Sequence, residues 1–378
     1  MRIPILLSLT VLIGCGGVTS DPLGLDAGGD AGALADASPF DAASLDAGST
    51  LDLKPLPRGV FESTVGLRTP SSDVVGDRSP DPLTGVMLKV PWDLCEQDCL
   101  LDTIEGQLDA AHARGLQASL IVLDAFNAPA RVLERCARFE YSFRGEPKQM
   151  CLPWDEVYLE EKASLLSALG ARFDDHPALA YVYFTGACAT NGAEGHCRVD
   201  EAGYTAAGYT EARLVEAYLR IMRAQRAAFP RTPIAFEVHA IFGRAEPWAS
   251  LWDEVKASGR VGVAAWWCAE RLSLSGDEIT PVWGLVQEAA TSAFSVCQTV
   301  GSFSSQPYRF SDPAQGFDYG TETDWDAADV NQAFEQTMDW AQGRASHGGQ
   351  GPIVPFSVLE PWSQDVVNPA FVDRLRTW

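Results

Sequence analysis

Beyond its N-terminal segment the chain has no hydrophobic run long enough to cross a bilayer, since a spanning helix needs about 20 apolar residues. It has no Cys-x-x-Cys pair, which disfavours the commonest structural zinc sites. No Gly-x-Gly-x-x-Gly or Gly-x-x-x-x-Gly-Lys motif follows a predicted strand, so the usual signs of a nucleotide-binding fold are missing. Basic residues are few, with 28 Lys and Arg against 51 Asp and Glu and a net charge of −23. Such acidity repels phosphate backbones, so we expect no nucleic-acid partner.

The N-terminus has the features of an export signal. Met1-Arg2 precedes an apolar stretch from Ile3 to Ile13, and Gly14 precedes Cys15. The sequence Leu-Ile-Gly-Cys resembles a bacterial lipobox. We therefore predict a lipoprotein signal over residues 1–14, lipid on Cys15, and a protein of the bacterial cell envelope anchored in a membrane by that lipid alone. The alternative is an ordinary signal peptide with an incidental cysteine.

A stalk is predicted after the signal, over residues 15–58. This stretch is rich in Asp, Ala and Gly, repeats Asp-Ala-Gly, and has almost no aromatic residue around which a core could form. Low hydrophobicity and charge repulsion predict a flexible linker. The remaining residues, 59–378, are predicted to form one folded domain.

The chain has nine cysteines, and removing the lipidated Cys15 leaves an even number in an exported protein. A preference for short loops predicts four disulfides, although sequence alone leaves many connectivities open. The predicted pairs are Cys95 with Cys99, Cys136 with Cys151, Cys188 with Cys197, and Cys268 with Cys297. A zinc site on Cys188, His196 and Cys197 is the competing interpretation, but an oxidising compartment favours disulfides, and we predict no metal.

The order of strands and helices predicts an α/β protein, a (β/α)8 TIM barrel. Apolar residues at helical spacing predict helices over 102–114 and 155–173, one beginning after Thr210, and one around 330–341. Strands that alternate with helices indicate a parallel sheet, and eight strands favour a closed barrel over an open doubly wound sheet. The predicted strands are Val60–Gly66, Gly85–Pro91, Gln117–Asp124, Leu179–Thr185, Pro233–His239, Val261–Trp267, Phe294–Val300 and Ile353–Leu359.

Two segments carry a family resemblance. The run from Pro153 to Glu160, followed by Leu166 to Tyr183, resembles the third helix and fourth strand of bacterial clan A-like glycoside hydrolases, barrels related to families 5 and 42. Ala128-Pro129 and the sequence Leu-Glu-Pro-Trp at 359–362 extend the similarity, which runs from about Gly85 to Trp378. The resemblance implies hydrolysis of an O-glycosidic bond by a pair of carboxylates.

In that clan the acid/base glutamate follows the fourth strand, and the nucleophilic glutamate ends the seventh. Glu194 lies in the loop after the predicted fourth strand, so the resemblance assigns it the first role. Gln298 occupies the place of the nucleophile, and an amide cannot form the glycosyl-enzyme bond. Glu360, at the end of the eighth strand, is the substitute that we predict, and Glu270 and Glu237 are the remaining candidates.

Each of these acids also has a structural interpretation. Glu194 is equally consistent with an exposed loop acid, Glu360 with a solvated strand-end residue, and Glu237 with a core pair formed with His239. Residues that follow predicted strands are candidates for contact with sugar: Trp92, Asp93, Asp124, Trp266, Trp267, Gln298 and Trp362. We therefore expect a monomer with a carbohydrate ligand and no cofactor. A barrel that binds sugar without turnover is the alternative, and a surface adhesion lipoprotein with the barrel as scaffold is a third interpretation.

Overall fold

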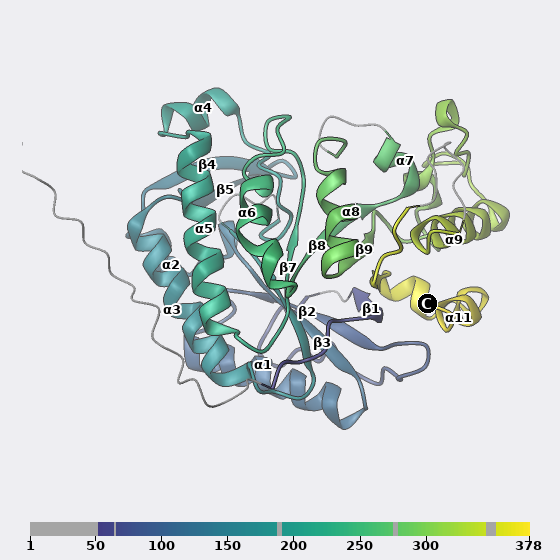
Figure 1. Ribbon diagram of the computed structural model, residues 1–378, viewed down its shortest axis with the longest axis horizontal. Helices are drawn as coiled ribbons and strands as arrows, with labels where there is room; N and C mark the ends of the chain where they lie inside the picture. Colours follow the sequence, from purple (N-terminus) through teal and green to yellow (C-terminus); the bar gives the residue numbers. More distant parts are fainter. Residues whose placement is uncertain (1–51, 64–65, 187–190, 275–278, 345–352) are drawn as a thin grey trace, which may run out of the picture. The chain divides into compact units, whose positions relative to one another are not determined.

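The computed structural model describes residues 52–63, 66–186, 191–274, 279–344 and 353–378. Eight parallel strands close into a barrel, in the order β1-β10-β9-β8-β7-β6-β3-β2. Figure 1 shows these strands surrounded by helices. The predicted (β/α)8 barrel is therefore confirmed. The strands are β1 Gly59–Ser63, β2 Gly85–Pro91, β3 Gln117–Leu123, β6 Leu179–Phe184, β7 Ile234–Glu237, β8 Val261–Cys268, β9 Ser295–Thr299 and β10 Val358–Glu360.

Helices connect the barrel strands, and the longest ones agree with the predicted positions. The longer helices are α1 Gln97–Ala113, α3 Glu156–Phe173, α5 Glu211–Ala228, α6 Trp248–Val255, α8 Trp283–Ser292 and α9 Ala327–Ala341. Three of these helices begin at a capping side chain. Asp155 accepts a hydrogen bond from Tyr158 N before α3, and Thr210 accepts one from Arg213 N before α5. A capping box at Asp326 begins α9. None of the helices in the described part of the chain is long and apolar enough to span a membrane.

The final strand differs from the prediction. β10 covers only Val358–Glu360, whereas the apolar pattern predicted a strand from Ile353. Pro355 has no backbone N–H to donate to a ladder, and Phe356 N bonds instead to Ala341 O at the end of α9. The strand therefore begins late, but its end at Glu360 is in register with Gln298 of β9.

The interior of the barrel is packed with aromatic side chains. Phe61, Tyr181 and Phe294 are fully buried there, and Tyr181 contacts both phenyl rings edge-on at 5.3 and 6.1 Å between centroids. Glycines provide the necessary room, since a Cβ at Gly85 would lie 2.6 Å from the Phe61 ring, and one at Gly262 would lie equally close to Phe294. This packing fills the barrel below its C-terminal mouth.

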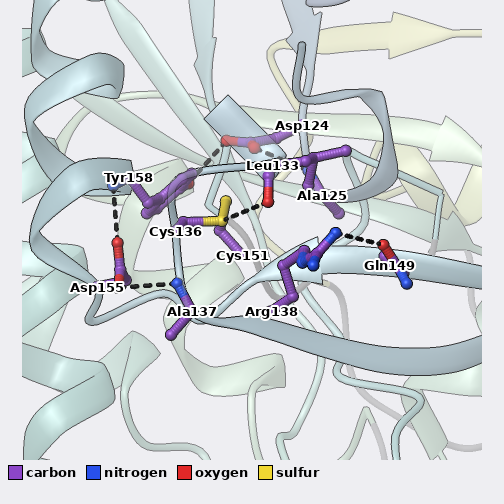
Figure 2. Close-up of a disulfide and its surroundings, with 10 residues drawn as sticks. All are labelled: Asp124, Ala125, Leu133, Cys136, Ala137, Arg138, Gln149, Cys151, Asp155 and Tyr158. Atoms are coloured by element: carbon purple, nitrogen blue, oxygen red, sulfur yellow. Dashed lines mark hydrogen bonds between the residues drawn. A yellow bond between two sulfur atoms is a disulfide. The ribbon is translucent and has the colours of Figure 1, made fainter. Parts of the chain in front are cut away.

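A hairpin that the sequence analysis did not predict follows the third barrel strand. It consists of β4 Arg138–Phe143 and β5 Glu146–Cys151, paired antiparallel. The disulfide Cys136–Cys151 closes its base, where Asp155 accepts hydrogen bonds from Ala137 N at 3.0 Å and from Tyr158 N at 3.2 Å (Figure 2). The hairpin is thus tied to the start of α3.

Two more of the predicted disulfides are present, Cys95–Cys99 before and within α1, and Cys268–Cys297 between β8 and β9. Cys197 is also disulfide-bonded. Cys188, its predicted partner, lies outside the described residues, as does Cys15, so that pairing and the lipid attachment stay predictions.

The end of the predicted stalk packs against the barrel. Lys54 N donates to Arg231 O at 3.1 Å, and the Lys54 ammonium donates to His176 O at 2.9 Å and to Leu179 O at 3.0 Å. These contacts lie at the N-terminal end of β6. Residues 52–58, assigned from the sequence to the stalk, therefore include part of the folded unit.

Candidate active site

A cavity of about 460 Å³ opens where the barrel strands end. Its walls combine indoles, charged side chains and two amides, and polar and aromatic side chains are typical of the C-terminal mouth of a TIM barrel. The residues that line it are Lys89, Leu123, Arg144, Asn191, Ala193, Glu194, His196, Arg198, His239, Trp266, Trp267, Leu272, Ile279, Gln298, Val300, Arg309 and Trp362. Glu194, Gln298 and the three tryptophans of this set were predicted from the sequence.

Glu360 is fully buried, does not belong to the cavity lining, and contacts the lining residue Gln298. Its Oε1 accepts from Tyr181 Oη at 2.6 Å and from Tyr183 Oη at 2.9 Å, and its Oε2 lies 3.0 Å from Gln298 Nε2. Burial raises the pKa of Glu360 to about 7, although these hydrogen bonds and the charge of Lys89 act in the opposite direction. Burial also raises the pKa of both phenols well above 10, so they remain proton donors.

Lys89 brings a positive charge to the cavity wall, within electrostatic reach of both candidate carboxylates. It extends from β2, donates to Ser63 Oγ at 2.8 Å, and lies 5.7 Å from the Trp266 ring and 5.8 Å from the Trp362 ring. Burial lowers the pKa of Lys89 to about 8, while the charges of Glu360 and Glu194 raise it. Both carboxylates are therefore close enough to influence one ammonium group.

The loop that carries Glu194 is fixed on both sides of this residue. Gly192 O accepts from Asp124 N at 2.7 Å, and Gly195 N donates to Glu237 Oε2 at 2.5 Å. A side chain at Gly192 would collide with Asp124 and the Asn127 amide, and its φ of +90° also favours glycine. Asn191 Oδ1 accepts from Glu194 N at 3.0 Å. The loop is thus held against β3 and β7.

The Glu194 carboxylate is partly exposed, at 30% of its side-chain surface, and faces the cavity. Burial raises its pKa, the negative charge of Glu237 raises it further, and His239 and Arg198 lower it. A carboxyl group with a raised pKa retains its proton nearer neutral pH, which suits a general acid. Among the predicted acids, Glu194 is the one that lines the cavity.

A second carboxylate and two imidazoles lie beside Glu194. Glu237, at the end of β7, is buried and accepts from His239 Nδ1, with 2.8 Å between that nitrogen and Oε1. The His196 and His239 rings are 4.3 Å apart, and His196 Nε2 lies 3.6 Å from Glu194 Oε2. Burial lowers the pKa of His196 to about 2, so this last contact joins Glu194 to a neutral imidazole rather than to a cation.

The predicted sugar-binding residues divide into two groups. Trp266, Trp267, Trp362 and Gln298 line the cavity, and the indole nitrogens of the tryptophans are fixed by bonds to Tyr183 Oη, Val238 O and Thr299 O respectively. Trp92 and Asp93 instead line a separate cavity of about 330 Å³ beside Cys95.

Asp124 and Glu270 also lie away from the cavity lining. Asp124 is fully buried and forms an ion pair with Lys162 at 2.7 Å, which explains its position without any ligand. Glu270 is buried at the start of α7 (Glu270–Leu274). Burial raises the pKa of Tyr319, and the negative charge of Glu270 raises it further. In the described residues, no group of three His, Cys, Asp or Glu side chains could hold a metal ion.

Several site residues were not predicted. Lys89 is the single charged residue in an otherwise apolar strand, and Tyr181 and Tyr183 alternate along β6, so both patterns indicated side chains inside the barrel. Arg144 and Arg309 come from the hairpin and from the 3₁₀ helix η3, Pro307–Phe310. No local pattern in the sequence places those two at the mouth.

Comparison with known proteins gave structural similarities only. No family model and no curated protein matches the chain. Among solved structures, endo-glycoceramidase II from Rhodococcus sp. in an iminocyclitol complex has 14% identity and a TM-score of 0.47, covering 85% of this chain and 79% of that one. Ega3 of Aspergillus fumigatus in complex with galactosamine has 10% identity and a TM-score of 0.40, covering 83% and 95%. A beta-galactosidase from Rahnella sp. R3 has 13% identity and a TM-score of 0.37, covering 56% and 40%.

Proposed function

We propose that this protein is a carbohydrate-active barrel of the cell envelope that hydrolyses an O-glycosidic bond, with Glu194 and Glu360 as its two carboxylates. The observation that carries the proposal is the arrangement around Lys89. Both glutamates act on this one ammonium group, in a site whose walls include Trp266 and Trp362. An aromatic wall packs against sugar C–H groups, while a carboxylate pair can act on the glycosidic bond.

Glu194 has the properties of the proton donor. Its side chain reaches the cavity, and burial and the negative charge of Glu237 raise its pKa, which favours the protonated form of the carboxyl group. In the proposed reaction its proton passes to the glycosidic oxygen as the bond from that oxygen to the anomeric carbon breaks. Water finally supplies a hydroxyl group to the anomeric carbon and a proton that restores Glu194.

Glu360 supplies the second carboxylate, which becomes ionised as the pH rises above its pKa of about 7. The hydroxyls of Tyr181 and Tyr183 orient it, and the positive charge of Lys89 favours its ionised form. As a carboxylate it stabilises positive charge on the sugar ring and acts as nucleophile or as base. Gln298 lines the cavity and contacts Glu360 Oε2, so its side chain must move before that oxygen can reach a sugar.

Sugar binding without turnover is the second candidate function. It is favoured by the complete burial of Glu360, whose two oxygens are both hydrogen-bonded. In that case the cleft retains its tryptophan wall and binds a glycan along Trp362, while no carboxylate reaches the anomeric carbon.

Parallel measurements of binding and hydrolysis separate the two candidates. Purified protein is titrated with a panel of oligosaccharides by calorimetry, and the same mixtures are assayed for new reducing ends. If the protein hydrolyses one of them, Glu194→Gln should lower kcat/KM by about 10²–10⁴-fold, since that is the usual contribution of a general acid. Glu360→Gln should do the same with little change in binding.

Glu160→Gln is the matched control, because Glu160 is exposed on α3. It should leave both readouts unchanged. Binding without new reducing ends would establish the second candidate, and the absence of both would refute the proposal. Full activity in both Glu194→Gln and Glu360→Gln would show that other groups perform the chemistry.

A further inference from the structure

The walls of the cavity are more basic than the rest of the protein. Lys89, Arg144, Arg198 and Arg309 line it, and among the described residues of its lining Glu194 is the one carboxylate. The whole chain has a net charge of −23. Resting on the proposed function, we propose that the ligand is an anionic glycan whose sugars bear carboxylate or sulfate groups, and that Arg144 and Arg309 bind those groups.

The two arginines lack the ion pairs that other arginines of this chain form. Arg131, Arg172 and Arg220 each pair with a glutamate on the surface. Within the described part of the chain, no carboxylate forms an ion pair with Arg144 or Arg309. In a chain with such an excess of acids, two cations at one cavity without such partners indicate a site for an external anion.

Their mutual position strengthens this conclusion. Burial lowers the pKa of Arg309, and the positive charge of Arg144 lowers it further, whereas Tyr308 and Glu194 raise it. The two guanidinium groups are thus close enough to repel each other. An anionic ligand between them would remove this repulsion, and a cationic sugar would add to it.

Arg144 is positioned by the stapled hairpin. Arg144 and Gly145 have φ values of +54° and +82°, as in the two-residue turn that joins tightly paired strands. Next to this turn, the Phe143 ring stacks on Phe126 with 5.5 Å between centroids. The Cys136–Cys151 disulfide fixes the other end of the hairpin (Figure 2). Arg144 therefore reaches the cavity from a supported element.

Arg309 is positioned by contacts of its own backbone and stem. Its carbonyl oxygen accepts two hydrogen bonds from Arg271, at 3.0 and 2.6 Å. Gly301 leaves room for its side chain, since a Cβ there would lie 2.9 Å from Arg309 Cδ. The neighbouring Phe310 stacks on Phe303 with 4.1 Å between centroids. The backbone of Arg309 is thus fixed, and its side chain lines the cavity.

The distribution of charge also orients the ligand. Glu360 and Glu237 are buried beneath the cavity, whereas Arg144 and Arg309 belong to its wall. A sugar carboxylate or sulfate would be repelled from the buried acids and attracted by the arginines, whose planar guanidinium groups match such oxyanions with two parallel hydrogen bonds. The scissile bond then faces Glu194 while the charged substituent faces the arginines.

Matched pairs of oligosaccharides test the inference. Galacturonate hexamers are compared with their methyl esters, and sulfated galactan hexamers with the desulfated forms, by calorimetry with the full folded unit. The charged member of at least one pair should bind about tenfold tighter or more, because charge-assisted hydrogen bonds to the arginines are stronger than neutral ones. Its affinity should fall with added salt, and that of the neutral member should not. Which pair responds distinguishes carboxylate from sulfate.

Substitutions of the two arginines test whether they bind the anionic group of the ligand. Arg144→Gln and Arg309→Gln should each weaken the charged ligand about tenfold by the loss of one charge-assisted contact, and leave the neutral ligand unchanged. The control is Arg114→Gln, an exposed arginine after α1, before β3 begins. Equal binding of charged and neutral members would overturn the inference but leave the proposed function standing, and no binding of any member would overturn both. Tight binding that survives both variants would assign the anion to other residues.

Discussion

The ion pair between Lys162 and Asp124 should be the most sensitive point in the support of the Glu194 loop. Lys162 Nζ lies 2.7 Å from Asp124 Oδ2 and 2.8 Å from Thr185 Oγ1, and the exposed fractions of the paired side chains are 1% and 0%. Asp124 also accepts from Tyr158 Oη at 2.8 Å (Figure 2). Its backbone N–H bonds to Gly192, so the pair lies directly behind the loop.

Lys162→Met keeps the length of the side chain but leaves the Asp124 carboxylate buried without its cation. Removing one partner of a buried ion pair costs about 3–5 kcal/mol, a large share of the roughly 5–15 kcal/mol that stabilises a folded protein. The tyrosine hydroxyl and the Ala125 N–H still donate to Asp124, so we expect the lower half of that range. Adding Asp124→Asn removes the uncompensated charge and should recover more than half of the loss.

Urea unfolding followed by tryptophan fluorescence gives the free energy of unfolding of each variant. Lys256→Met is the control, because Lys256 is 40% exposed and pairs with Asp253 and Glu288 on the surface, where ion pairs contribute about 0–1 kcal/mol. A cost below about 1 kcal/mol for Lys162→Met, or no recovery in the double variant, would refute the electrostatic account.

Three further outcomes are expected. Burial raises the pKa of Glu360 from 4.5 to about 7. The stability that its protonated form provides should therefore be complete below pH 4.5 and be lost as the pH rises through 7. In Glu360→Gln the melting temperature should depend less on pH between 4.5 and 7. Glu237→Gln removes a charge that raises the pKa of Glu194, so the alkaline limb of kcat/KM should shift to lower pH, whereas a purely structural effect would reduce activity without a shift. Cys15→Ala should release the protein from the membrane fraction of the native host, and unchanged fractionation would argue against the lipid anchor.

The barrel could be predicted because local sequence patterns indicate most of its strands. A parallel strand covered on both faces is continuously apolar, and strands such as β2, β3, β6 and β8 contain such runs, whereas β1 and β9 are partly polar. The β4–β5 hairpin was missed although Arg138–Phe143 alternates polar with aromatic residues, as a half-exposed strand does, because the predicted barrel strands were recognised by continuous apolar runs. Its pairing depends on the Arg144–Gly145 turn and on the disulfide at its base, and the turn contains only one glycine as a signal.

Residues of the candidate site were predictable where they follow a strand end. Gln298, Glu360 and Trp362 are at or just after the ends of β9 and β10, and the strand pattern alone brings them together. Arg144 and Arg309 are supplied by elements that lie between strands, so their convergence depends on tertiary packing. Asp124 also follows a strand, but its side chain forms an ion pair with Lys162 of α3 and does not line the cavity. Because the two residues are far apart in the sequence, no local pattern predicts that they pair.

The accessibility of Glu360 is decided by residues on other strands. Its position at the end of β10 is a local property, but Tyr181 and Tyr183 from β6 and Gln298 from β9 occupy both of its oxygens. These side chains are large because the interior of the barrel must be filled, and they are polar at their tips because a buried carboxylate needs donors. The same packing that fixes Glu360 therefore separates it from the cavity. In the proposed reaction, hydrolysis would consequently require movement of the Gln298 side chain, whereas the binding of a sugar along Trp362 would not.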